Sequence, residues 1–176
     1  MNYNVGDIFT DDEFYTDRAI FCNENGFYIE EIETLENGTR QFQICKPAEK
    51  TLEELKAEKL AELTAITSKF DNQLVNTDMI IKSSLGFSIN ADLRSQNNLR
   101  SLISVGVEPV NFVIADNSVQ SLTLKQLNVL LNECALNGQS LYLQKWGYKA
   151  QIENAQTKEE LEAIELKFTM KDFANE

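Results

Sequence analysis

The first 46 residues alternate short apolar runs with polar turns, a pattern that predicts β structure. Asn25-Gly26 and Asn37-Gly38 mark the turns, because such dipeptides best tolerate the positive φ of tight hairpins. They separate the β-prone runs AIFC, GFYIEEI and RQFQI. We therefore expect a three-stranded antiparallel β meander. Its strands hold few large apolar residues, so we expect the sheet to need stabilising contacts with another chain or with the rest of the protein.

A long amphipathic helix is predicted after Pro47. Thr51 and Glu54 have the spacing of a capping box, and they open the run TLEELKAEKLAELTAITSKFDNQL. Its apolar positions recur close to one face of a helix, at Leu52, Leu55, Leu63, Ile66, Phe70 and Leu74. Lys59 interrupts this stripe where a heptad requires an apolar residue, which favours a helix that packs on its own domain. A parallel coiled coil stays open as the alternative.

The next segment predicts two hairpins with a capped helix between them. MIIKSSLGFSI and VNFVIADNSVQSL each place a polar turn between β-prone residues. Asn90 or Asp92 can cap the intervening helix, and Gly106 and Pro109 end it. Its candidate inward residues are Leu93, Leu99, Leu102 and Ile103. We expect both hairpins to join one small sheet on which the helices pack.

The longest predicted helix begins after Thr123. One stripe runs along it through Leu124, Leu127, Leu131, Cys134, Leu141, Tyr148 and Ile152. Gly138 and Gly147 each cost about 1 kcal/mol relative to alanine inside a helix. We expect one continuous helix and place any kink at Asn137-Gly138.

A short terminal helix completes the predicted fold. Thr157 and Glu160 form its capping box, and its inward positions are Leu161, Ile164 and Phe168. The predicted class is α+β. An N-terminal β meander over residues 1–46 serves as a docking module. A mainly helical domain over residues 47–176 contains the long amphipathic helix, the two hairpin-helix units and the long C-terminal helix.

Composition favours a cytoplasmic or virion-borne protein. Of the 176 residues 43% are hydrophobic, enough for one core. The chain has an odd number of cysteines, and their spacing is not that of zinc ligands: Cys22, Cys45 and Cys134. This cysteine usage favours a reducing compartment. The opening residues lack the basic start and apolar run of a signal peptide, and no apolar stretch is long enough for a membrane span. We expect no contact with a membrane.

The net charge of −12 restricts the partners. Residues 1–62 hold 15 acidic and 6 basic residues, and residues 63–152 hold 6 and 7. Phosphate backbones and anionic lipids repel such a surface, so we expect no nucleic-acid partner. The charge by itself also fits a small acidic inhibitor of a host protein.

The sequence offers no candidate catalytic centre. It contains no histidine, which removes the usual general base near neutral pH and the commonest metal ligand. The phosphate-binding and nucleophile motifs GxxxxGK[ST], GxGxxG and GxSxG are absent. Two acidic clusters, at residues 11–13 and 30–36, fit no known ligand spacing. We expect neither enzyme activity nor a cofactor nor a metal.

Aromatic residues gather in the acidic N-terminal region. A surface for a partner protein can be assembled from Phe9, Phe14, Tyr15, Phe27 and Tyr28. Core packing of a thin sheet explains the same residues, together with Phe21, at least as well. Trp146 and Tyr148 are predicted to be packing residues, and Cys134 is predicted to be an inert buried thiol.

From about residue 47 onward the chain resembles a family of phage and prophage proteins that carry a domain of unknown function and are encoded with tail-fibre genes. The order of four segments along the chain carries the resemblance. The segments are PAEKTLEELKAEKLAEL, SSLGFSINADLRSQNNLRSLI, VNFVIADNSVQSLTLKQLNVLLNECA and IENAQTKEELEAI. The chain departs from the family in lacking a histidine in the last long helix and in carrying Gly138.

The resemblance implies a virion tail component or adaptor, with a transient tail-fibre assembly chaperone as the alternative. The implied partners are a tail-fibre or baseplate protein, and self-association into a homo-oligomer stays open. The implied location is the virion tail, or the host cytoplasm during assembly. The resemblance transfers no catalytic residue.

Overall fold

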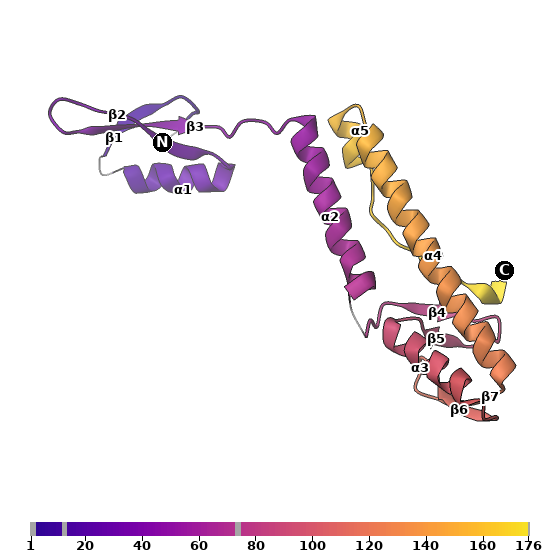
Figure 1. The fold of residues 1–176 in the computed structure, drawn as a ribbon. Helices are drawn as coiled ribbons and strands as arrows, with labels where there is room; N and C mark the ends of the chain where they lie inside the picture. Colours follow the sequence, from indigo (N-terminus) through magenta and orange to yellow (C-terminus); the bar gives the residue numbers. More distant parts are fainter. Residues whose placement is uncertain (1–2, 12–13, 73–74, 176) are drawn as a thin grey trace. The chain divides into compact units, whose positions relative to one another are not determined.

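Two compact units make up the protein. The computed structural model describes residues 3–11, 14–72 and 75–175. One unit spans Met1–Lys50 and the other Thr51–Glu176 (Figure 1). Each unit has hydrophobic packing of its own. The first contains strands and one helix, and the second contains helices and two hairpins, so the predicted α+β class is confirmed.

Unit 1, as we call residues 1–50, is a three-stranded antiparallel sheet with one helix. Its elements are β1 (Ile8–Thr10), α1 (Tyr15–Asn25), β2 (Tyr28–Thr34) and β3 (Arg40–Cys45). The strand order is β1-β3-β2, with β3 in the centre. Strand residues alternate between the two faces of a sheet, and those facing α1 form the core with it: Phe9, Cys22, Phe42 and Ile44.

The order of the strands corrects the predicted meander. Residues 19–22, the run AIFC, lie in α1 and not in a strand, while Ile8–Thr10 supplies the third strand. The run is helical because Tyr15 and Cys22, two helical turns apart, both reach the sheet core from one side of the helix. Gly26 ends α1 with a left-handed φ of 68° and does not turn a hairpin. The turn at Asn37-Gly38 between β2 and β3 is as predicted.

Unit 2, residues 51–176, is built around two long helices. Its elements are α2 (Leu52–Asn72), β4 (Ile80–Lys82), β5 (Ser88–Asn90), α3 (Leu93–Val105), β6 (Val110–Val113), β7 (Val119–Leu122), α4 (Leu124–Asn154), α5 (Lys158–Glu162) and a 3-10 turn at Phe173–Asn175. In Figure 1 α2 lies beside α4, and the two hairpins and α3 lie near the start of α4.

The helix caps predicted in unit 2 are present. The Glu54 carboxylate accepts the Thr51 backbone N–H at 2.8 Å, and the Thr51 hydroxyl accepts the Glu54 N–H at 3.3 Å. Asp92 caps α3, Thr123 caps α4 and Thr157 caps α5 through their side-chain oxygens. The helices therefore begin where short-range polar contacts fix them.

The two hairpins do not form the single sheet that we expected. β4–β5 and β6–β7 are separate two-stranded sheets, linked by one backbone hydrogen bond from Ala115 N to Ser88 O at 3.0 Å. They share a core with α3 and α4 whose buried residues are Ile81, Ile89, Ala91, Leu99, Phe112, Ile114, Leu122, Leu127, Leu130 and Cys134. Side-chain packing, and not a common strand ladder, holds the hairpins together.

The other end of unit 2 has a smaller core between α2, α4 and α5. Leu63, Ile152, Ala155 and Leu161 are buried there. α2 therefore packs on its own domain, as predicted from its apolar stripe; Leu74 of that stripe lies outside the described residues. α4 is continuous through both of its glycines.

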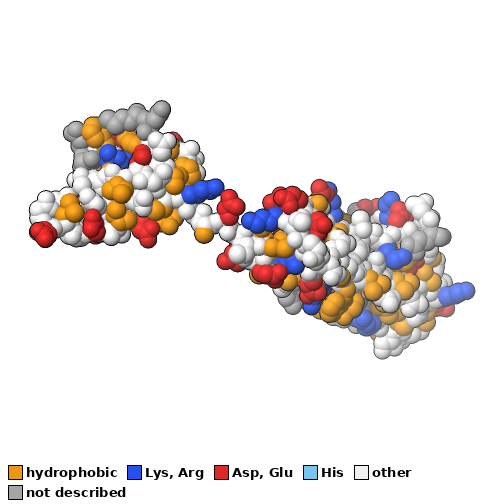
Figure 2. All heavy atoms as spheres, turned by 90° about the horizontal axis from the view of Figure 1, so that it is seen from above, with side chains coloured by type: hydrophobic (Ala, Val, Ile, Leu, Met, Phe, Trp, Pro, Cys, Tyr) orange, Lys and Arg blue, Asp and Glu red, His pale blue; other side chains and the backbone are white. Residues whose placement is uncertain are grey.

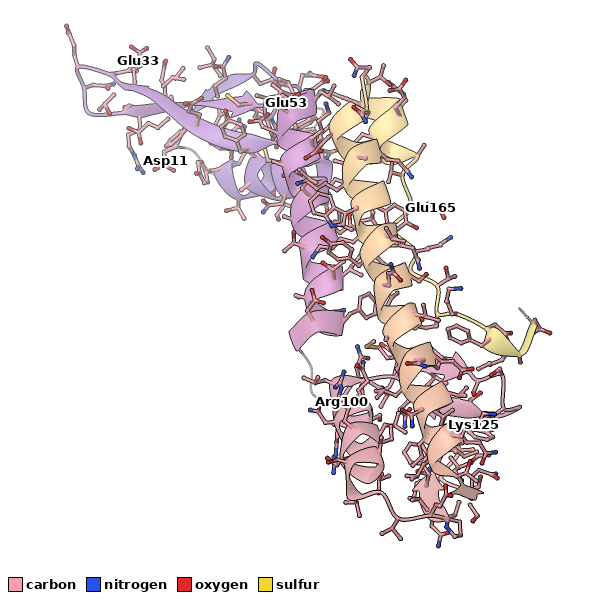
Figure 3. All side chains as sticks on the ribbon, turned by 45° about the vertical axis from the view of Figure 1, so that its right-hand side comes forward. Asp11, Glu33, Glu53, Arg100, Lys125 and Glu165 are labelled. Atoms are coloured by element: carbon pink, nitrogen blue, oxygen red, sulfur yellow. The ribbon has the colours of Figure 1, made fainter. Side chains whose placement is uncertain are left out.

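The chain after α5 is extended and not helical. α5 ends at Glu162, so Ile164 and Phe168, predicted on a terminal helix, lie beyond it and pack on the small core from an extended segment. Figure 3 shows this segment, which carries Glu165, beside α4. Polar side chains of α4 hold it: Gln144 bonds both backbone groups of Thr169, with its Oε1 accepting at 2.9 Å and its Nε2 donating at 3.0 Å.

Replacing Thr123 by alanine is expected to lower the free energy of unfolding of unit 2 by about 1 kcal/mol. The substitution removes the hydroxyl that accepts the Gln126 N–H at 3.3 Å and leaves that donor without its cap. Urea unfolding followed by the fluorescence of Trp146, the single tryptophan, measures the change. Thr64→Ala, inside α2 on an exposed position, is the matched control and should not destabilise the unit. Equal losses in both variants would contradict the capping role.

Candidate interaction surfaces

The aromatic residues predicted as one partner surface are divided by the sheet of unit 1. Phe9 is 7% exposed and stacks on Phe42 with ring centroids 5.8 Å apart. Tyr15 and Phe27 are half-buried and pack against the same core, and Phe14 is half-buried at the start of α1. Tyr28 is 45% exposed. The predicted set therefore supplies core residues plus a single well-exposed ring.

Tyr28 belongs to the face of the sheet that α1 does not cover. By strand alternation this open face consists of Ile8, Thr10, Tyr28, Glu30, Glu33, Gln41, Gln43 and Cys45. Ile8 and Glu30 both pair with Gln43, and Tyr28 pairs with Cys45. Ile8 is exposed like Tyr28, so the open face offers apolar contacts bordered by polar groups.

The thiol of the open face is not activated. Desolvation, a hydrogen bond from Cys45 Sγ to Glu30 Oε2 at 3.5 Å and the charge of Glu30 all raise the pKa of Cys45 above its ordinary value. A nucleophilic cysteine needs the opposite shift, which basic neighbours produce. The open face therefore suits binding and not covalent chemistry.

Unit 2 holds a second thiol that is shielded from solvent. Cys134 is buried in the shared core, as predicted, and burial together with the neighbouring charge of Glu133 raises its pKa to about 12. Glu133 is itself buried, and its Oε1 accepts the Ser84 N–H at 3.0 Å and the Ser84 hydroxyl at 2.5 Å. This carboxylate anchors the β4–β5 turn to α4.

In residues 3–11, 14–72 and 75–175 no three acidic or cysteine side chains lie close enough together to hold a metal ion. Asp12 and Glu13, part of the first acidic cluster of the sequence, lie outside those ranges. Among the described helices none is both long enough and apolar enough to cross a membrane.

Iodoacetamide at pH 8 is expected to modify Cys45 before Cys134 in the native protein. Cys45 is half-buried and reachable, whereas Cys134 is buried and, with its pKa near 12, holds almost no thiolate at that pH. Because the pKa of Cys45 is also raised, its labelling should be slower than that of free cysteine and should accelerate as the pH rises. Peptide mass spectrometry reads both sites, with urea-unfolded protein as control. Rapid native labelling of Cys134 would contradict this assignment.

A hollow of about 410 Å³ opens between α2, α3 and α4. Its apolar lining comes from Phe70, Met79, Leu93, Leu141 and Tyr142, and its polar lining from Thr67, Asp71, Gln96 and Lys145. Leu93, predicted to point inward, is exposed at this site because it begins α3. Gly138 also lines the hollow, and a side chain placed there would meet nothing within 4 Å.

The side of α4 opposite the core carries large exposed apolar residues. Leu136, Tyr142, Leu143 and Trp146 are 50, 58, 62 and 49% exposed. The Tyr142 and Trp146 rings meet edge to face with centroids 6.0 Å apart, and Lys149 Nζ lies 4.8 Å from the centroid of the Trp146 ring. The expectation that Trp146 packs in the core is therefore wrong, whereas Tyr148 does pack on the smaller core. We call this surface, residues 135–150 on the solvent side, the α4 outer face.

A signal for the α4 outer face is present in the sequence. Ala135, Tyr142, Trp146 and Ala150 recur at helical spacing on the side away from the Leu127–Ile152 stripe. A helix with apolar residues on both sides has a second surface to cover. The prediction for this helix used only the stripe from Leu124 to Ile152, so it did not include the α4 outer face.

The family comparison matches most of unit 2. Residues 51–166 fit the model of a family described as a domain of unknown function, DUF4376. No curated protein and no solved structure matches the chain. The matched range begins at the Thr51 cap of α2 and continues past α5, so it includes both hairpins and the α4 outer face. Since the match covers well over half of the chain, the protein belongs to the DUF4376 family.

Proposed function

We propose that this protein is a bacteriophage tail or tail-fibre-associated adaptor that joins other proteins during tail assembly. One observation carries the proposal: exposed apolar residues lie on two separately cored units, on the open face of unit 1 and on the α4 outer face of unit 2. A chain with one such surface on each unit can hold two partners, and one of the two can be a second copy of the chain. The tail context comes from the resemblance of the region after residue 47 to proteins encoded with tail-fibre genes.

The open face of unit 1 is the proposed contact for a tail-fibre or baseplate protein. Tyr28 and Ile8 supply apolar area, and tyrosine is enriched at the centres of protein interfaces. Residues 1–50 hold eleven acidic and four basic residues, and acidic side chains such as Asp11 and Glu33 project from this unit (Figure 3). A partner with basic residues around an apolar patch complements this surface.

Tyr28→Ala is expected to abolish capture of the tail protein by the tagged full-length chain. The ring is exposed and outside the core, so its loss should remove binding without unfolding unit 1. Pull-down from infected or induced cells followed by mass spectrometry provides the measurement. Ile20→Ala, an exposed apolar residue on α1, is the matched control and should retain the partner. Loss of capture with Ile20→Ala alone would place the contact elsewhere.

The composition of mature particles separates an adaptor from a chaperone. Stoichiometric presence in purified virions supports the adaptor, whereas presence only in fibre complexes before assembly supports the transient chaperone. Absence from virions and from every fibre complex would remove the tail function altogether. Binding to a basic host enzyme that weakens steeply with salt would support the acidic inhibitor instead.

A further inference from the structure

We infer that the α4 outer face is the interface of a homodimer, in which α4 packs antiparallel against α4 of a second copy. This inference does not rest on the proposed tail function, because it concerns the isolated protein. It rests on the charge pattern of α4, on the exposed aromatic cluster and on the symmetry of the pairing.

The solvent side of α4 lacks the charges that a surface helix normally carries opposite its core. Between Lys125 and Glu153 the exposed residues on that side are Asn128, Asn132, Ala135, Leu136, Gln139, Tyr142, Leu143, Trp146, Gly147 and Ala150. None is charged, and the apolar ones occupy about four turns, a length of about 22 Å. Lys145 and Lys149 lie half-buried along one edge. Figure 3 labels Lys125 at the start of α4.

The charge distribution of the protein favours a second copy at this face. Each chain carries a net charge of −12, and acidic side chains are visible on both units (Figure 2). Residues 1–62 hold 15 acidic and 6 basic residues, so two copies that meet through unit 1 or the first half of α2 repel each other. Residues 124–152 contain a single acidic residue, Glu133, which is buried and hydrogen-bonded to Ser84. Along α4 two copies can therefore approach without opposing carboxylates.

The order of residues on the face selects the antiparallel arrangement. We place the two-fold axis on the α4 outer face, at the level of Gln144 along the helix. This axis sets Tyr142 of one copy against Trp146 of the other, and Lys149 against Gln139. The edge-to-face Tyr142–Trp146 pair of each chain then joins that of the second copy in a cluster of four rings. A parallel arrangement would place Lys149 beside Lys149 and Glu153 beside Glu153, where like charges repel.

Leu143 is placed close to the axis, which makes it the residue to test. Leu143→Glu sets two carboxylates against each other in the dimer but leaves the monomer unharmed, since the side chain is 62% exposed. Val119→Glu, at a 59% exposed position on β7, is the matched control. Light scattering coupled to size exclusion, over a concentration series of the full chain, measures the mass.

The native chain and Val119→Glu are expected at about 40 kDa, twice the 20.0 kDa of one chain. Leu143→Glu is expected at the mass of one chain, with its dissociation constant raised about thirty-fold or more and its circular dichroism unchanged. A native chain that stays monomeric at every concentration overturns the inference. A dimer that survives Leu143→Glu overturns it as well. So does a monomeric native chain whose binding to a different protein is lost with Leu143→Glu, because the face then belongs to that partner.

Cross-linking tests the direction of the helices. In a Cys45→Ser background, Leu143→Cys is expected to form a disulfide-linked dimer under mild oxidation, because the two copies of residue 143 flank the axis. Asn128→Cys is not expected to cross-link, since an antiparallel pair separates the two copies of residue 128 by about 48 Å along the helices. Cross-linking of Asn128→Cys overturns the antiparallel arrangement.

Discussion

A protein carrying Leu127→Ala is expected to lose about 2–5 kcal/mol of the free energy of unfolding of unit 2. Leu127 is fully buried near the start of α4, in the core that α4 shares with α3 and both hairpins. Truncation removes its apolar contacts and leaves a cavity that the surroundings fill only in part. Domains are stable by about 5–15 kcal/mol, so the change is a large share of the total.

The position of Leu127 also determines which other elements the substitution destabilises. The two hairpins have no strand ladder in common, and packing on the shared core is what joins them. We therefore expect amide exchange to accelerate in β4–β5 and β6–β7 together. Urea unfolding followed by Trp146 fluorescence measures the free energy, and Leu93→Ala, the same substitution at an exposed position of α3, is the control. A comparable loss with Leu93→Ala would show that burial is not the cause.

Ile44→Ala extends the test to the independence of the two units. Ile44 is fully buried in the separate core of unit 1. Its truncation is expected to expose the amides of β3 while the Trp146 transition, which reports unit 2, stays in place. A parallel shift of that transition would mean that the two cores unfold as one.

Local signals were the most predictable part of this fold. A capping box needs only two side chains and the backbone between them, so Thr51 with Glu54 could be identified from spacing alone. Spacing also placed Thr123 at the start of α4, narrowed the cap of α3 to Asn90 or Asp92, of which Asp92 is the cap, and marked the turn between β6 and β7. None of these contacts depends on what distant segments do.

Contacts between distant segments were not predictable in the same way. The run AIFC is short and apolar, and such a run fits a strand or a buried helix equally well until its packing partner is known. The central place of β3 follows from pairing with both β1 and β2, which local spacing does not encode. For the candidate surfaces, strand alternation separates exposed Tyr28 from buried Phe9 only once the strand bounds are known.

The C-terminal segment is the clearest case of a structure set by distant residues. Asn137 is fully buried on α4, and its Oδ1 accepts the Lys171 N–H at 3.0 Å. Further along α4 Gln144 bonds Thr169, and the Tyr148 hydroxyl donates to Lys167 O at 2.6 Å. Every second residue of the extended chain thus meets a polar side chain of the helix, which takes the role of a neighbouring strand. The three side chains recur at helical spacing on one side of α4, but they differ in type, and their spacing does not show that their partner is an extended segment.

Asn137→Leu is therefore expected to destabilise unit 2 by about 1–3 kcal/mol and to loosen the C-terminal segment. Leucine has a similar shape but accepts no hydrogen bond, so the Lys171 N–H loses its partner in a partly buried site. Gln144→Leu should act in the same direction through Thr169. Both variants are expected to exchange the amides of residues 167–171 faster and to be cut sooner by trypsin after Lys167 and Lys171.

Asn98→Leu supplies the matched control, because Asn98 is exposed on α3 and its replacement should change stability by no more than about 0.5 kcal/mol. If residues 167–171 keep their protection in both α4 variants, apolar packing of Phe168 and Met170 holds the segment and the polar side chains do not. If protection falls with Asn137→Leu but not with Gln144→Leu, the attachment lies at Lys171 and the neighbouring bridge between Lys82 and Asp172. Faster exchange in both variants, with the free energy lowered in step, would show that α4 fixes this segment through its amide side chains.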